Sequence, residues 1–360
     1  MAQVPPPVAT VPITVAGPAP VRRGRSPLGA LGRIGRTIWR LVTTNRKVMA
    51  GSVLVTFFIL VAIFGPLFVA QNPNRITSNL LALPSSAHLL GTNQLGQDLF
   101  SQLVVGTRSS VFWSFAAGML VMVIAVTIGL VSGYFGGTID DVLTLITNVF
   151  LVIPAFPLAV ICVQFFSRST VVVAVVVALT NWPWGARVMR AQTLSIRNRE
   201  FITAARANGE STWRMIFFDI FPNEASIVAA SFITTTIQVL LQVAGLEFLG
   251  FGDSSAVSWG VMLNAAINGS ALLQGAWWWL VPPGLCIALL GSGLALLNFG
   301  IDEIADPRLR TLRRRPQGWV GPASAVAAVF DLLSPRRRRA RRGKVSRSEP
   351  SKSFRGGAGV

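Results

Sequence analysis

The side chains that most often carry out chemistry are scarce in this chain. His88 is the only histidine, and the two cysteines, Cys162 and Cys286, lie inside apolar runs. A metal site or a histidine-assisted nucleophile needs several such residues at short spacing, and the sequence has no such group. A phosphate-binding loop ends a glycine-rich turn with lysine, and none of the three lysines follows such a turn. We therefore expect no catalytic residue, metal site or bound cofactor in this chain.

One polar segment, residues 200–223, is suited to mechanical contact rather than to catalysis. Its alanines favour a helix with a smooth surface that another backbone can approach closely. Gly209 permits a chain reversal that other residues resist, and Ser211 with Thr212 can cap a second helix. Pro222 is expected to end that second helix. The segment therefore predicts two short helices joined by a turn, which could dock onto a soluble partner; an ordinary connecting loop is the alternative.

A few polar residues inside apolar runs are candidates for a solute pathway. Glu247 lies near the end of one run, where a carboxylate in water at the membrane edge is an equally good interpretation. Asn148, Asn181 and Gln242 also lie within apolar runs, and hydrogen bonding between helices is the commoner role of such residues. The pathway candidates are Glu247, Asn148 and Gln242.

Six apolar runs could position these residues in a membrane, because a helix crosses the hydrocarbon core with about 20 apolar residues. Pro154 and Pro157 lie in the third run, and Pro183 is expected to break the fourth. Hydrophobic residues make up 52 % of the 360 residues and charged residues 13 %, as expected for a chain largely in lipid. The prediction is an all-α membrane protein with six transmembrane helices. The runs are Val48–Ala70, Ser110–Ser132, Val142–Phe166, Val171–Val188, Ile227–Gly250 and Ala276–Gly300.

The arginines and lysines that flank these runs predict the orientation, because short cytoplasmic loops are enriched in both. Residues 22–47 and 190–214 carry many arginines, whereas 72–107 contains one and 251–275 contains none. We therefore expect both termini in the cytoplasm, an extracytoplasmic loop at 71–107 and a cytoplasmic loop at 190–224. Trp277, Trp278 and Trp279 are expected in the aromatic belt at the membrane surface.

The net charge of +18 could suggest nucleic acid, but the positive charge lies in the tails and in one internal segment. We expect no nucleic-acid partner. Residues 1–42 are predicted to be a cytoplasmic tail with a basic amphipathic helix at Leu28–Leu41 on the membrane surface. Residues 311–360 are predicted to be a basic cytoplasmic tail near anionic lipid headgroups. No cleavable signal is expected, because the first apolar run begins as late as Val48.

The polar segment resembles the EAA loop of importer permeases of the ATP-binding-cassette superfamily. In that loop Glu-Ala-Ala is followed by glycine and later by Leu-Pro. Here Thr203 stands at the glutamate position before Ala204 and Ala205, and Phe221 stands before Pro222 where leucine is common. The stretch 184–201 resembles the peptide and nickel subfamily of these permeases.

Three further stretches resemble the C-type subunit of the same subfamily. The first, His88–Asp98, has Asn93 and Gln97 in place of the usual Asp and Arg. The others are Phe248–Leu263 and Trp278–Arg308. Together the four stretches, in the same order as in the family, cover about residues 43–310.

The resemblance implies a type I importer permease fold for residues 43–310, in a bacterial cytoplasmic membrane. It implies a sister permease, two ATPase subunits that bind ATP and magnesium, and an extracytoplasmic substrate-binding protein. The short helices would then transmit movement of the ATPase subunits to the spans. The residues that it assigns to this contact are Glu200, Thr203, Ala204, Ala205, Arg206, Gly209 and Pro222.

Peptides are the solute that this resemblance favours, with nickel or oligosaccharides such as cellobiose as alternatives in the same transporter class. A membrane-embedded enzyme is an alternative function, but the sequence has no Ser/His pair or histidine metal site for it. An ion-driven carrier or channel is a second alternative function, and it would need more ionisable residues inside the spans than this sequence has.

Overall fold

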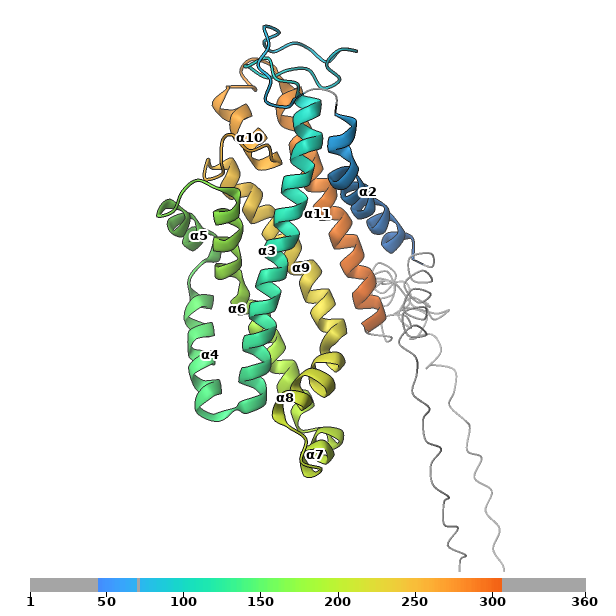
Figure 1. Cartoon of the computed structure of the whole chain (residues 1–360), viewed down its shortest axis with the longest axis vertical. Helices are drawn as coiled ribbons and strands as arrows, with labels where there is room; N and C mark the ends of the chain where they lie inside the picture. The colour runs from blue at the N-terminus through green and yellow to red at the C-terminus, as the bar shows by residue number, and fades with distance from the viewer. Residues whose placement is uncertain (1–44, 70–71, 306–360) are drawn as a thin grey trace, which may run out of the picture. The chain divides into compact units, whose positions relative to one another are not determined.

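The computed structural model describes residues 45–69 and 72–305, and in these residues the helices are joined by loops (Figure 1). The described part contains no strand, only one isolated bridge between Thr92 and Asp98. This confirms the all-helical prediction. The tails 1–42 and 311–360, with the helix expected at 28–41, fall outside the described residues. The helices are α2 Arg46–Phe68, α3 Leu99–Phe135, α4 Gly137–Val152, α5 Ala155–Gln164, α6 Thr170–Arg197, α7 Glu200–Ala207, α8 Thr212–Arg214, the π-helical turn η1 Met215–Ile220, α9 Phe221–Phe248, α10 Trp259–Asn268 and α11 Trp277–Ala305.

Five helical stretches are long and apolar enough to cross a membrane: α2, α3, α6, α9 with the helical turns before it, and α11. Helices α4 and α5 meet the same test only as a pair, bent by 87° relative to each other, so the described residues hold five spans, or six if this pair counts as one. Arg197 at the end of α6 donates hydrogen bonds to the carbonyls of Gly133 and Tyr134 at the end of α3. Because α3 and α6 end side by side, the chain between them must return across the bundle, and α4 with α5 makes that return.

The effect of the prolines differs from the prediction in two helices. The third run is divided at Ile153 and Pro154, since Pro154 and Pro157 both lack the N–H that would continue the helix. The fourth run is not broken, because α6 continues through Pro183 to Arg197. Pro183 is buried in a tightly packed helix, whereas Thr147 is the one buried residue of α4. Tertiary packing therefore keeps α6 continuous and gives α4 little support.

Two predicted boundaries also change. Helix α3 begins at Leu99 rather than Ser110, because the Asp98 carboxylate caps it by accepting from the Ser101 N–H at 2.8 Å. The loop before it therefore spans 72–98 instead of extending to 107. Pro222 does not end a helix: the chain is helical from Thr212 through η1 to Phe248, with Pro222 in the first turn of α9. Proline is tolerated there because the first N–H groups of a helix have no intrahelical partner.

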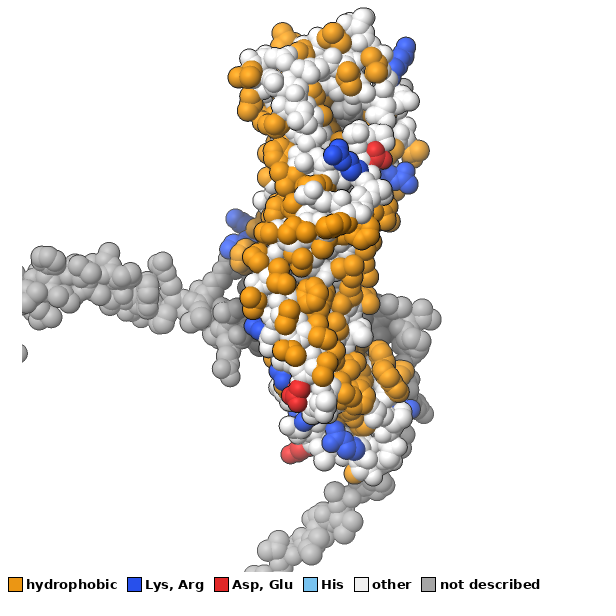
Figure 2. All heavy atoms as spheres, turned by 90° about the vertical axis from the view of Figure 1, so that its left-hand side faces the viewer, with side chains coloured by type: hydrophobic (Ala, Val, Ile, Leu, Met, Phe, Trp, Pro, Cys, Tyr) orange, Lys and Arg blue, Asp and Glu red, His pale blue; other side chains and the backbone are white. Residues whose placement is uncertain are grey.

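The centre of the bundle is the close contact between α3 and α6. A Cβ atom added at Gly133 would lie 2.6 Å from the Thr193 Cβ, so glycine is needed for this approach. Around the contact, alanine and valine side chains from α3, α5, α6 and α9 form a buried cluster. The outer surface is also apolar, and hydrophobic side chains cover much of the middle of the face shown in Figure 2. Such a surface suits lipid or other membrane helices.

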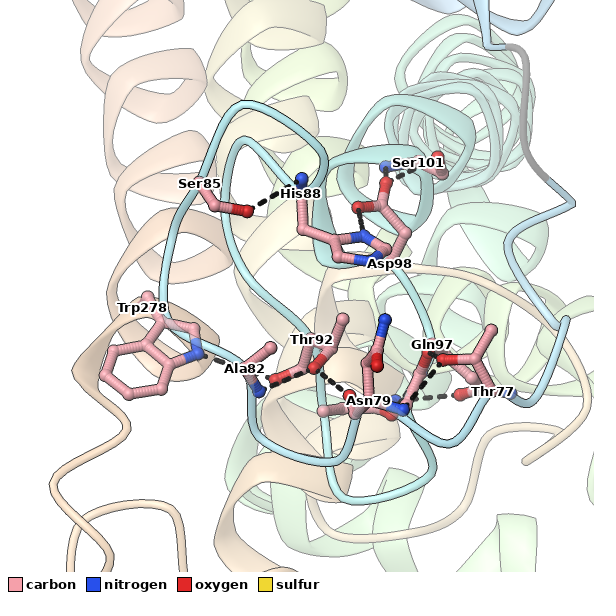
Figure 3. A network of polar contacts seen from close by, with 12 residues as sticks. Thr77, Asn79, Ala82, Ser85, His88, Thr92, Gln97, Asp98, Ser101 and Trp278 are labelled. Atoms are coloured by element: carbon pink, nitrogen blue, oxygen red, sulfur yellow. Dashed lines mark hydrogen bonds and ion pairs between the residues drawn. The ribbon is translucent and has the colours of Figure 1, made fainter.

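A cap formed by residues 72–98 and α10 covers the end of the bundle opposite α7 (Figure 1). His88 Nδ1 lies 3.0 Å from an Asp98 carboxylate oxygen, and the Thr92 hydroxyl bonds the carbonyl of Asn79 (Figure 3). Trp278 and Trp279 are buried beneath this loop, whereas Trp277 is exposed. The aromatic-belt prediction is therefore wrong for Trp278 and Trp279, which are part of the core of the cap.

Candidate functional site

Helix α7 and the turn after it form the end of the bundle opposite the cap (Figure 1). The N–H of Gly209 bonds the Arg206 carbonyl at 3.1 Å, and the N–H of Glu210 bonds the Ala205 carbonyl at 3.1 Å. Gly209 has φ +77°, the left-handed conformation that ends many helices. Helix α8 begins directly after Ser211, as the sequence predicts. The first short helix and the turn at Gly209 are therefore present as expected, but the second helix is not short, because it continues from Thr212 to Phe248.

One buried side chain anchors α7 to the bundle. Ile202 is 0 % exposed and belongs to a hydrophobic cluster with residues of α3, α6 and η1. The guanidinium of Arg206 lies 5.9 Å from the centre of the Tyr134 ring, at the end of α3. Because Ile202 fills this cluster, α7 is packed against the ends of α3, α6 and η1. The other members of the cluster are Leu130, Tyr134, Ile196, Met215, Ile216 and Ile220.

The small residues of α7 face away from this anchor. Thr203, Ala204 and Gly209 are exposed, and Ala205 is half-buried. Glu200 and Arg206 are exposed at the two ends of α7, and the Thr203 hydroxyl donates to the Arg199 carbonyl at 3.3 Å. Pro222 is exposed but lies apart from this surface, on α9. We call the exposed part of residues 200–213 the α7 surface.

The sequence prediction missed exposed aromatic residues beside these small ones. Phe201 is on α7, and Trp213 and Phe217 follow the turn with their rings stacked at 5.9 Å and 17°. All three are exposed. Large aromatic residues in an otherwise polar segment were the available signal, since such side chains are enriched at protein interfaces.

The sequence prediction also missed the polar contacts that fasten the neighbouring helices. Arg190 of α6 makes two hydrogen bonds to Asp140 of α4, at 2.6 and 2.7 Å. The buried Glu224 of α9 accepts from the Thr193 hydroxyl of α6 at 3.0 Å. These contacts tie α4 and α9 to α6 near the end that carries α7. Charged residues at the borders of apolar runs were the only signal, and their partners are distant in sequence.

Glu247 is not at a water-filled edge. It is 2 % exposed, and its carboxylate accepts a hydrogen bond from the Ser258 hydroxyl at 2.7 Å. Gly260 and Gly252 pack against its side chain, because a Cβ atom at either glycine would lie within 3.0 Å of it. The interpretation as an exposed interfacial carboxylate is therefore wrong for this conformation. In the described residues Glu247 joins α9 to α10.

The other two pathway candidates are hydrogen-bonded between helices. Asn181 and Gln242 bond each other reciprocally, at 2.9 and 2.8 Å, and so connect α6 with α9. Asn148 of α4 accepts from Arg187 of α6 at 2.7 Å and is itself exposed. No hydrogen bond joins Asn148, Gln242 and Glu247 to one another in the described residues. Their role in a pathway stays a prediction.

In the described part of the chain, no three His, Cys, Asp or Glu residues are placed together so that they could hold a metal ion.

Comparison with known protein families gives a clear match. The model of the "binding-protein-dependent transport system inner membrane component" family matches residues 125–311, more than half of the chain. The chain belongs to this permease family. A second model, the "N-terminal TM domain of oligopeptide transport permease C", matches residues 34–84 of the permease.

Two relatives identified by sequence agree with this assignment. The permease is 31 % identical over 278 residues to the "dipeptide transport system permease protein DppC" of Alkalihalophilus pseudofirmus, covering 77 % of this chain and 90 % of that one. It is 33 % identical over 274 residues to the "oligopeptide transport system permease protein OppC" of Mycobacterium tuberculosis, with 75 % and 93 % covered. A solved structure of the MetNI methionine ABC transporter in inward-facing conformations has a TM-score of 0.44 and 20 % identity, covering 56 % of this chain and 94 % of that one.

Membership of this family places the chain in the inner membrane, which it crosses several times. Its relatives are permease subunits of ABC transporters and not enzymes, so ATP hydrolysis belongs to separate ATPase subunits. A permease of this family works with a binding protein, with ATPase subunits and with a second permease.

Proposed function

We propose that this permease forms half of the translocation pathway of an ATP-driven peptide importer, and that its α7 surface binds one ATPase subunit. The observation that carries the proposal is the construction of α7. Its inner face is fixed by the fully buried Ile202, while Thr203 and Ala204 are exposed at the end of the bundle. A helix that is both anchored and accessible can transmit a displacement to the membrane helices.

The movement would be transmitted through contacts already described. A push on α7 acts on the cluster around Ile202, to which α3, α6 and η1 contribute. The Asp140–Arg190 and Glu224–Thr193 contacts then carry it from α6 to α4 and α9. Displacement of packed helices between two arrangements is the physical basis of alternating access. The π-helical turn at Met215–Ile220 lies along this route, and such turns are frequent at functional sites.

Peptides are the proposed solute because the relatives that resemble the chain over most of their length carry dipeptide or oligopeptide transport in their names. The proposed partners are one sister permease, two ATPase subunits that bind ATP and magnesium, and an extracytoplasmic binding protein that delivers the peptide. Nickel and oligosaccharides are the alternative solutes.

The proposed orientation places α7 and both termini in the cytoplasm. Six crossings put the two termini on one side, and the arginines of residues 190–214 lie at the α7 end of the bundle. Cytoplasmic loops are enriched in such cations. The cap formed by residues 72–98 and α10 would then face the binding protein.

The test is uptake by the complete transporter in proteoliposomes, with its binding protein and ATP. We expect uptake of a labelled tripeptide in preference to cellobiose or Ni²⁺. Ala204→Trp should abolish ATP-dependent uptake by blocking close approach at the α7 surface. Thr138→Trp is the matched control, because Thr138 is also exposed at this end of the bundle, in the first turn of α4. Uptake of cellobiose or Ni²⁺ alone would contradict the peptide assignment, and full activity of Ala204→Trp would contradict the docking assignment.

A further inference from the structure

The break between α4 and α5 leaves main-chain groups without helical partners. Ile153 and Pro154 are extended, with ψ of 124° and 120°, and α5 then departs at 87°. The N–H of Ile153 makes no backbone hydrogen bond to the described residues, and Pro154 has no N–H. The carbonyls of residues 149–152 therefore lose the donors that a continuing helix would supply four residues later.

These groups lie within an apolar run and are not covered by this chain. Val152 is 83 % exposed, Ile153 is also exposed, and Thr147 is the one buried residue of α4. Irregular backbone at membrane depth is not found facing lipid, because each unsatisfied polar group there costs several kcal/mol. It occurs only where other protein covers it or where it lines a water-filled cavity. The break must therefore face one of these two environments in the assembled transporter.

A polar stripe on α4 favours the water-filled cavity. Asp140, Thr144 and Asn148 follow one another at steps of four residues, which place them along one side of the helix toward the break. Arg190 and Arg187 of α6 bond the first and last of them. The last pair, Asn148 and Arg187, is hydrogen-bonded and yet exposed. Polar groups inside a membrane span are costly in lipid and face the bundle interior or a water-filled cavity. The stripe ends one turn before the break.

We propose that the α4–α5 break is a solute-binding subsite on the translocation route, and that it binds the main-chain amide groups of a peptide. Ile153 offers its N–H and its carbonyl as a residue at the edge of a strand does, whereas the Pro154 carbonyl accepts from the Leu158 N–H of α5 at 3.1 Å. An extended peptide pairs with such an edge through its own backbone. The exposed side chains at the break, Val152 and Phe156, are apolar and uncharged. Recognition by backbone pairing tolerates many peptide sequences. The ligand assignment rests on the proposed function.

The test uses the complete transporter with Cys162→Ala and Cys286→Ala, so that each added cysteine is unique. Val152→Cys places a thiol at the break. Met119→Cys is the matched control, because Met119 is 53 % exposed on the uninterrupted helix α3. Met119 and Val152 are also separated from the α3–α4 turn at Gly136 by nearly the same number of residues, one before the turn and one after it. Both variants are treated with a charged thiol reagent that does not cross membranes, with and without trialanine. Uptake of trialanine by the cysteine-free transporter is measured in parallel.

We expect the reagent to label Val152→Cys and not Met119→Cys. Trialanine at about four times its Kd should slow the labelling about fivefold, since the subsite is then free about one-fifth of the time. Absence of labelling at Val152→Cys would show that lipid or the sister permease covers the break and would overturn the proposal. Labelling without protection, while trialanine is transported, would overturn the subsite alone. Absence of trialanine uptake would overturn the proposed peptide function.

Discussion

At the scale of single residues, the turn after α7 depends on Gly209. Its φ of +77° lies in the left-handed region, and no other atom lies within 4 Å of the position a Cβ would take. A side chain there would therefore meet no steric obstacle, and its cost would come from the backbone alone. That cost is about 1–2 kcal/mol for an ordinary residue and is smaller for asparagine.

Gly209→Val is expected to shift the turn and misplace the α7 surface. ATP-dependent uptake should fall by an order of magnitude or more while the amount of protein in the membrane stays the same. Gly209→Asn is the matched control, because asparagine tolerates the left-handed conformation and should retain most of the uptake. Normal uptake by Gly209→Val, measured in the same proteoliposomes, would show that the turn does not need this conformation.

Ser258→Ala is expected to destabilise the contact between α9 and α10. It removes the hydrogen bond that Ser258 donates to the buried Glu247 at 2.7 Å. Leaving a buried polar group without its partner costs about 1–3 kcal/mol. The midpoint of thermal unfolding in detergent should fall by several degrees. Ser255→Ala, which removes a bond to the exposed end of Asp253, should leave the midpoint unchanged. Equal midpoints for both variants would contradict this role of Ser258.

At the scale of elements, α7 has one fully buried side chain, Ile202. Truncating it should weaken binding of the ATPase subunits without preventing insertion into the membrane. Ile202→Ala opens a cavity in the cluster at the end of the bundle, at a cost of about 2–5 kcal/mol. We expect the variant to reach the membrane but to lose ATPase subunits during purification. Phe201→Ala is the control for a local change on α7, since Phe201 is 43 % exposed and leaves the anchor intact. Retention of the ATPase subunits by Ile202→Ala would contradict the anchoring role.

The two prolines show what the sequence could and could not predict about the elements. Pro154 and Pro183 both lie in apolar runs, and each removes one helical N–H. Pro183 is buried in α6, whose many buried residues keep the helix continuous, whereas α4 has one buried residue and a second proline follows at 157. The difference depends on tertiary contacts, so the sequence predicted the break in the wrong helix.

In the candidate site too, local features could be predicted from the sequence and features that depend on tertiary contacts could not. The turn at Gly209 and the small residues of α7 are local features, and the sequence predicted them because composition and spacing are sufficient. The Asp140–Arg190 pair joins residues 50 positions apart, so its existence depends on how α4 packs against α6. Glu247 was singled out correctly as unusual, but its burial against Ser258 and Gly260 could be recognised only once α10 was placed.

At the scale of the whole molecule, the described residues form five spans and the bent α4–α5 pair, with a polar cap at one end and the α7 surface at the other. The apolar runs, their order and the position of α7 with its turn were predicted from hydropathy and glycine placement. The chain belongs to a family of importer permeases, which work with a binding protein and with ATPase subunits. We propose that these partners meet opposite ends of the bundle. The central claim is that the α7 end meets the ATPase subunits.

Site-directed cross-linking in the assembled transporter tests that claim most directly. A cysteine-free chain carrying Ala204→Cys has a single thiol on the exposed part of α7. We predict that a short bifunctional thiol reagent links it to an ATPase subunit, and that Ser85→Cys, in the loop of the cap, gives no such product. Failure of Ala204→Cys to cross-link to any ATPase subunit, or its labelling from the extracytoplasmic side, would contradict the account.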